Sequence, residues 1–139
     1  MNVLSRLHSD DLGKLLIRLA VGGLMLFHGI AKLQHGIGKI VQVVESKQLP
    51  CYLAYGVYVG EIVAPILILI GFLTRPAALV MCVNMAVAIW LVHMTDLKCI
   101  TEAGAWGVEL QMFYLVGALA LFFAGAGRFS ISRGKGSLD

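Results

Sequence analysis

The stretch VYVGEIVAPILILIGFLTRP, residues 57–76, decides how this chain must fold. Nearly every residue from Val57 to Leu73 is apolar, which suits a helix that crosses a bilayer, since such a helix needs about 17–25 mostly apolar residues. Glu61 lies inside the run, and Pro65 follows one helical turn later. An ionisable group is costly at that depth, so Glu61 asks for a structural or functional reason.

The rest of the chain shares this apolar character. Of its 139 residues, 59% are hydrophobic and 14% are charged, whereas soluble domains are about 45–50% apolar and about 25% charged. The composition therefore predicts an integral membrane protein with one domain over residues 1–139. The net charge of +3 is dispersed. No basic patch with interleaved aromatic residues is present, so we do not expect a nucleic-acid partner.

Four segments are long and apolar enough to cross the bilayer, at about 13–33, 53–73, 77–95 and 106–125. The sequence Thr74–Pro76 predicts a tight turn between the second and third. Between the first two spans, apolar residues from Ile37 to Val44 recur with a helical period. The predicted fold is all-α: an antiparallel four-helix transmembrane bundle with a short amphipathic interfacial helix between the first and second spans. The first span follows basic residues, as a signal peptide does, but we expect it to be retained.

The distribution of Lys and Arg predicts the orientation in the membrane. If the N-terminus is inside, seven basic residues lie on the inner side and four on the outer side. The positive-inside rule then places both termini in the cytoplasm. The inner residues are Arg6, Lys14, Arg18, Arg75, Arg128, Arg133 and Lys135, and the outer ones are Lys32, Lys39, Lys47 and Lys98.

One ionisable residue from each span falls in the same outer half of the bilayer. These residues are His28, Glu61, His93 and Glu109, and Lys32 follows His28 on the same helical face. Unpaired charges that face lipid are costly, so we expect these side chains to face the bundle interior. Pro65 cannot donate the bond that the Glu61 carbonyl would accept, which predicts a kink beside the same recess.

The polar recess has a functional and a structural interpretation. Intramembrane ionisable residues are functional by default, and a proton-sharing His–Glu pair beside an apolar slot suits a quinone carbonyl. In the structural interpretation the same residues join the helices, with Lys32 neutralising one carboxylate. Two His and two carboxylates could also bind zinc or iron, but no helix carries the Glu-x-x-His pair of di-metal bundles, so we predict no metal site.

The three cysteines give no redox motif. Cys51 and Cys99 fall in the predicted outer loops, where a disulfide between them is one alternative, and Cys82 lies inside the third span. The chain carries no CxxC, and we interpret Cys82 as a packing residue.

Several stretches of the chain together resemble one family. They are LLIRLAVGGLMLFHGIAKL (15–33), AYGVYVGEIVAPILILIGFLTRPAAL (54–79), the position of His93, and VELQMFYLVGALALFFAGAGRFSI (108–131). Across residues 12–132 the chain resembles the DoxX family of small bacterial four-helix membrane proteins. Ala126 stands where that family often has a proline. The resemblance carries a first-span His onto His28 and acidic residues onto Glu61 and Glu109; His93 fits more loosely.

The resemblance implies a multi-pass protein of the bacterial inner membrane. Family members are linked to quinone-reducing thiosulfate oxidation, to thiol and oxidative-stress defence complexes, and to metal-peptide biosynthesis. We therefore predict a redox-linked subunit or accessory, an enzyme only as part of a quinone-linked oxidoreductase. Its partners would be the lipid bilayer, a quinone or other lipophilic substrate, and a redox protein or a second copy.

Roles within that predicted site can be assigned to individual residues. Glu61 would accept a proton and His28 would share or orient it, with His93 and Glu109 completing a catalytic wall. His28, Lys32, Glu61 and Glu109 would contact the quinone. Two alternatives remain open: proton-coupled or small-solute transport through the same polar residues, and a scaffold for a partner oxidoreductase or a metal-peptide maturation system.

Overall fold

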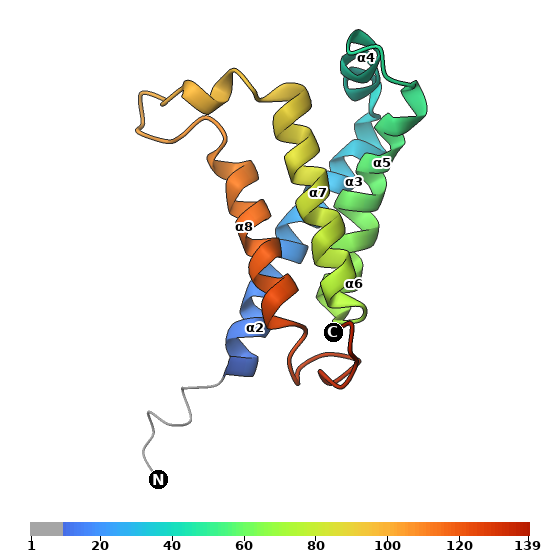
Figure 1. The fold of residues 1–139 in the computed structure, drawn as a ribbon, viewed down its shortest axis with the longest axis vertical. Coiled ribbons are helices and arrows are strands. Elements are labelled where there is room, and N and C mark those ends of the chain that lie inside the picture. Colours follow the sequence, from blue (N-terminus) through green and yellow to red (C-terminus); the bar gives the residue numbers. More distant parts are fainter. Residues whose placement is uncertain (1–9) are drawn as a thin grey trace.

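The computed structural model describes residues 10–139, and its regular elements in that range are helices (Figure 1). An isolated β-bridge joins Ile100 and Trp106. The predicted all-α class is therefore confirmed. Arg6, used in the charge count above, lies outside the described residues. The elements are α2 (Asp10–Arg18), the π-helical η1 (Leu19–Gly23), α3 (Leu24–His35), α4 (Gly38–Ser46), the 3-10 helix η2 (Cys51–Tyr55), α5 (Gly56–Tyr58), the π-helical η3 (Val59–Val63), α6 (Ala64–Ile70), α7 (Thr74–Val92), the 3-10 helix η4 (Asp96–Lys98) and α8 (Glu109–Ala124).

Three continuous helices are long and apolar enough to cross a membrane. They are Asp10–His35 with 26 residues, Cys51–Ile70 with 20 and Thr74–Val92 with 19. The fourth predicted span, 106–125, is only partly confirmed, because α8 has 16 residues. At about 1.5 Å per residue α8 is about 24 Å long, less than a hydrocarbon core of about 30 Å. Trp106 and Gly107 belong instead to the preceding loop, where Gly107 N donates to Cys99 O.

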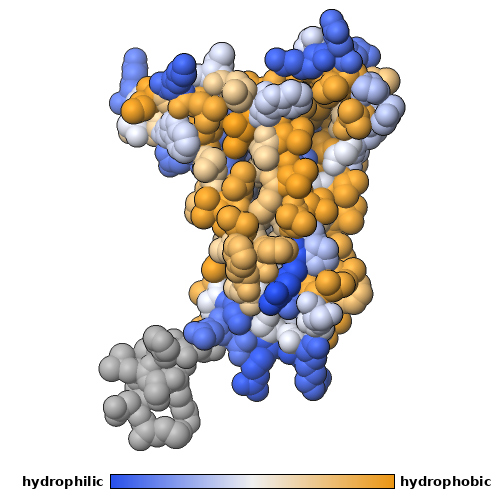
Figure 2. Space-filling view, in the orientation of Figure 1, coloured by the Kyte–Doolittle hydropathy of each residue, from blue (hydrophilic) through white to orange (hydrophobic). Residues whose placement is uncertain are grey.

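The two ends of the bundle are polar and its middle is apolar (Figure 2). One end carries α4 and the loop between α7 and α8, and we call it the α4 end. The opposite end carries the α6–α7 turn, the start of α2 and residues 125–139, and we call it the α6–α7 end (Figure 1). The α4 end corresponds to the predicted outer side.

The turn between the second and third spans differs from its prediction. It is made by Gly71–Leu73, where Gly71 and Leu73 adopt left-handed backbone conformations with φ of 69° and 49°. Thr74 and Pro76 already belong to the first turn of α7. Proline is tolerated there because the first amides of a helix have no intrahelical acceptor.

The predicted amphipathic helix is present as α4. Its buried Val44 packs with Ile37 and Ala54 in a small cluster of apolar side chains. Tyr58 and Leu91 from the second and third spans also pack against this cluster. The apolar face of α4 therefore rests on the α4 end of the bundle.

The second span changes geometry where Glu61 and Pro65 predicted a kink. Residues Val59–Val63 form a π-helix, and Ala64 N donates to Val59 O, five residues earlier. A Cβ atom at Gly29 of α3 would overlap the Glu61 carbonyl oxygen, so the two helices touch backbone to backbone there. The Glu61 carbonyl, to which Pro65 cannot donate, thus packs against a glycine.

Residues 125–139 pack against the α6–α7 end. Thr74 N donates to Asp139 Oδ1 over 3.1 Å, and Ser132 Oγ donates to Gly71 O over 3.0 Å. Arg18, only 1% exposed, bonds to this segment and to α6. In the sequence Arg18 counted only as a basic residue of the inner side. In the structure it joins α6 to residues 125–139.

Candidate functional site

Glu61 is a carboxylate buried in the apolar middle of the bundle. It lies in η3 and is 5% exposed. Its Oε2 forms an ion pair with Lys32 Nζ on α3, and the Lys32 side chain is partly exposed. An unpaired charge at this depth would be far more costly than a paired one. The ion pair therefore accounts for the presence of Glu61, and the π-helical geometry around it is one that recurs at functional sites.

Tyr114 of α8 is buried in the same part of the bundle. Its side chain is 3% exposed and lies within electrostatic range of the Glu61 carboxylate. The His28 ring lies edge-on to the Tyr114 ring, with centroids 5.8 Å apart and an interplanar angle of 84°. His28 itself belongs to the exposed surface of α3. We call His28, Lys32, Glu61 and Tyr114 the Glu61 cluster.

Asn84 of α7 adds an unused donor beside the cluster. A Cβ atom at Gly60 would overlap the Asn84 side chain, so the amide packs directly on the residue preceding Glu61. Asn84 Nδ2 is buried and has no hydrogen-bond partner. Such unsatisfied atoms are uncommon and ask for an explanation, such as a bound water or ligand.

His93 forms a second polar group at the α4 end. Its Nδ1 lies 2.8 Å from Asp96 Oδ2, and its Nε2 lies 3.0 Å from Gln111 Nε2. An amide nitrogen only donates, so His93 Nε2 accepts and Nδ1–H donates to Asp96. Gln111 Oε1 is buried without a partner. A turn of that amide would present an acceptor to a doubly protonated imidazole.

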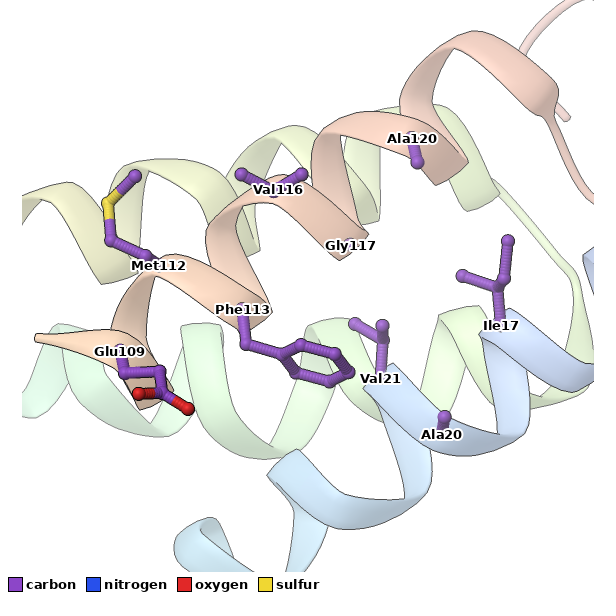
Figure 3. Close-up of a pocket in the computed structure, with 9 residues that line it drawn as sticks. All are labelled: Ile17, Ala20, Val21, Glu109, Met112, Phe113, Val116, Gly117 and Ala120. Atoms are coloured by element: carbon purple, nitrogen blue, oxygen red, sulfur yellow. The ribbon is translucent and has the colours of Figure 1, made fainter. Parts of the chain in front are cut away.

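Glu109 is the first residue of α8, and its side chain bonds to the loop that precedes the helix. Its Oε2 accepts a hydrogen bond from Trp106 N over 3.1 Å, and an acidic group there favours the helix N-terminus. The exposed Glu109 side chain also lines the rim of an apolar groove of about 490 Å³ between α8 and the first helix (Figure 3). The other lining residues are Ile17, Ala20, Val21, Met112, Phe113, Val116, Gly117 and Ala120.

The four residues predicted to share one recess thus divide among three places. Glu61 and His28 belong to the Glu61 cluster, His93 contacts its own loop and α8, and Glu109 bonds to the loop before α8. Within the described residues, no hydrogen bond or ion pair joins His93 or Glu109 to Glu61. Their catalytic role stays a prediction.

Sequence reasoning left two residues outside the site that the structure brings to it. Tyr114 and Asn84 carry uncharged polar side chains, whereas the predicted site consists of His, Lys and Glu residues alone. A search that included uncharged polar side chains from the third and fourth spans would have found both.

No metal or thiol centre emerges in the described part of the chain. No group of three His, Cys, Asp or Glu side chains within residues 10–139 is placed to hold a metal ion. Cys51, Cys82 and Cys99 are all free, so the disulfide considered between Cys51 and Cys99 is not formed. Cys82 Sγ lies 3.5 Å from Leu115 O, as expected of a packing residue between α7 and α8.

Comparisons with known proteins agree with the membrane architecture. A family model described as DoxX matches residues 13–94. An uncharacterized protein of Haemophilus influenzae is 32% identical over 111 residues, covering 80% of this chain and 81% of that protein. An uncharacterized membrane protein of Mycobacterium tuberculosis is 32% identical over 133 residues, covering 84% of this chain and 77% of that protein. No solved structure shows significant similarity to this chain.

Proposed function

This chain belongs to the DoxX family of integral membrane proteins, and we propose that it serves as a quinone-associated subunit of a redox complex. The observation that carries the proposal is the Glu61 cluster. It combines a buried carboxylate, its ammonium partner, a phenol and an imidazole in the apolar middle of the bundle. Protonatable side chains at that depth suit a lipid-soluble substrate that gains or loses protons.

The chemistry assigns one task to each group. A quinone that receives two electrons from a partner oxidoreductase also needs two protons to become a quinol. His28, at the surface of α3, would bond to a quinone carbonyl and deliver one proton. Glu61 would accept a proton and pass it on, and Lys32 would stabilise its charged form. His93 and Glu109 would line the approach from the α4 end.

The proposal includes a place in the cell. The chain is a multi-pass membrane protein with bacterial relatives. We place it in the bacterial inner membrane with both termini in the cytoplasm, as the distribution of Lys and Arg favours. The Glu61 cluster would then lie in the outer leaflet. A partner redox protein would donate the electrons. The chain could also assemble as a homo-oligomer.

The test replaces the carboxylate by its amide. In cells that lack the gene, a copy encoding the unchanged protein should restore the ratio of quinol to quinone extracted from membranes. Glu61→Gln should fail to restore it while accumulating in the membrane to the same level. Glu45→Gln on exposed α4 is the matched control and should restore the ratio. Full restoration by Glu61→Gln would remove the proposed role.

A proton pathway is the second candidate, favoured by one observation. Asn84 Nδ2 and Gln111 Oε1 are buried and unpartnered, so polar atoms extend beyond the Glu61 cluster toward the α4 end. Protein in liposomes that carry a pH-sensitive dye separates the candidates. Dissipation of a pH gradient without any quinone would favour the pathway over the redox subunit.

A further inference from the structure

The apolar groove beside α8 is a feature that the Glu61 cluster does not use. It lies between α8 on one side and α2 with η1 on the other (Figure 3). Three of its lining residues are small, namely Ala20, Gly117 and Ala120. Glu109 is its one charged lining residue. Along α8 the lining runs from Glu109 to Ala120, about 16 Å at about 1.5 Å per residue.

The shape of the groove is fixed where the Val21 side chain packs on Gly117. A Cβ atom at Gly117 would lie 2.6 Å from Val21 Cγ2, so α8 and η1 already touch at this point. They cannot close further to fill the space beside them. From this contact α3 and α8 lean apart toward the α4 end (Figure 1). The groove is therefore a standing feature of the fold.

A chain of aromatic rings connects the groove with the Glu61 cluster. Phe113 lines the groove, and its ring centroid lies 6.1 Å from that of Tyr114. Tyr114 in turn contacts the His28 ring at 5.8 Å. Two successive ring contacts therefore separate His28 from the groove.

We propose that this groove holds the prenyl tail of a quinone whose ring lies at His28 and Tyr114, an inference that rests on the proposed function. Its volume of about 490 Å³ is that of a small-molecule site, about 300–1,000 Å³. It is less than half of the roughly 1,200 Å³ that a partner helix of about 10 Å diameter would fill over the same length of about 16 Å. Phospholipid is the poorer occupant, because its phosphate would approach the Glu109 carboxylate. The groove thus selects long-tailed quinones over short, water-soluble ones.

The test uses two photoreactive azido-benzoquinones, one with an isoprenoid tail and one without, on protein in phosphatidylcholine nanodiscs. The tailed probe should label α8 peptides at least fivefold more than the tail-less probe. Ala120→Phe fills the groove and should lower labelling by the tailed probe at least fivefold, leaving the tail-less probe unchanged. Ala86→Phe, at an exposed position of α7 away from the groove, is the matched control and should label normally.

The outcomes separate this inference from the proposed function. Normal labelling of Ala120→Phe by the tailed probe overturns the tail site, even if Glu61→Gln still fails to restore the quinol ratio. Tail-dependent labelling that Ala120→Phe abolishes supports it, even if Glu61→Gln restores that ratio. If Ala120→Phe does not accumulate, Val116→Phe fills the same groove from an exposed position and gives the same two readings. Equal labelling by both probes, or loss of labelling when phosphatidylglycerol replaces half of the phosphatidylcholine, would identify the groove as a lipid site and overturn the proposal.

Discussion

Arg18 and Glu61 are both charged residues buried inside the bundle, but their surroundings differ. Arg18 donates four hydrogen bonds to backbone carbonyls: Nε to Ile68 O, Nη2 to Leu69 O, and Nη1 to Ala126 O and Phe129 O, over 2.6–3.0 Å. Glu61 has one ion pair, and the buried amide nitrogen of Asn84 beside it is unpartnered. The Arg18 region is closed by its own backbone, whereas the Glu61 region keeps polar capacity in reserve.

This contrast separates a structural charge from a candidate functional one. The last carbonyls of α6 have no intrahelical donors and carry the negative end of the helix dipole, so a guanidinium suits them. Only Thr74 Oγ1 stays unpartnered at this end among the described buried side chains. At the Glu61 cluster the lone donor of Asn84 leaves room for a ligand or a water molecule.

The largest expected effect is that of Arg18→Met. It removes all four bonds and leaves Leu69 O, Ala126 O and Phe129 O without donors, which should lower the free energy of unfolding by about 3–5 kcal/mol. Denaturant unfolding in detergent micelles gives the value. Arg18→Lys keeps the charge but loses the planar guanidinium, so its free energy of unfolding should lie between those of the unchanged protein and of Arg18→Met. Arg133→Met, at an exposed position, is the control. An equal loss in both variants would show that Arg18 does not anchor the α6–α7 end.

Lys32→Met should come next. It leaves the Glu61 carboxylate buried without a partner, at a cost of about 2–3 kcal/mol, below the value for a fully buried pair because Lys32 reaches the surface. The double variant Lys32→Met with Glu61→Gln removes both charges and should recover most of that loss. A double-mutant cycle of unfolding free energies measures the coupling. Additive losses would show that the pair is not coupled.

Gly29→Ala should destabilise the protein by about 1–3 kcal/mol, because the added methyl group overlaps the Glu61 carbonyl and forces two helices apart. Gly13→Ala is the matched control, since nothing lies within 4 Å of a Cβ atom there. That control should be neutral or stabilise α2 by up to about 1 kcal/mol. Thermal unfolding of both variants in one detergent compares them, and a stable Gly29→Ala would contradict the backbone contact.

The smallest effect on stability should come from Asn84→Leu. This substitution removes an amide whose buried Nδ2 has no partner and keeps a similar volume, so the free energy of unfolding should change by less than about 1 kcal/mol. Labelling by the tailed quinone probe measures whether the amide also meets a ligand. A loss of more than about 2 kcal/mol in the free energy of unfolding would show that Asn84 Nδ2 has a partner in the membrane, such as a bound water.

Some features of the fold and site follow from local sequence. The four helices and α4 follow from runs and periods of apolar residues, and the break near Pro65 follows from its missing N–H. Burial and pairing of Glu61 follow from the cost of a lone charge in lipid. The structural interpretation, in which Lys32 neutralises one carboxylate, matches the observed ion pair with Glu61. The beginning of α8 was less predictable. Trp106 is apolar enough to belong to a span, but its Nε1 donates instead to Leu97 O in the loop.

By itself the sequence determined a membrane protein of apolar helices that carry a few ionisable residues, because hydrophobicity and helical period are local properties. Only the tertiary structure decided which of those residues meet. It paired Lys32 with Glu61, placed Tyr114 beside them, turned His93 to its own loop, and buried Arg18 among carbonyls. Helix rotation and tilt set these contacts, and both depend on how glycines such as Gly29 and Gly117 let the backbones approach.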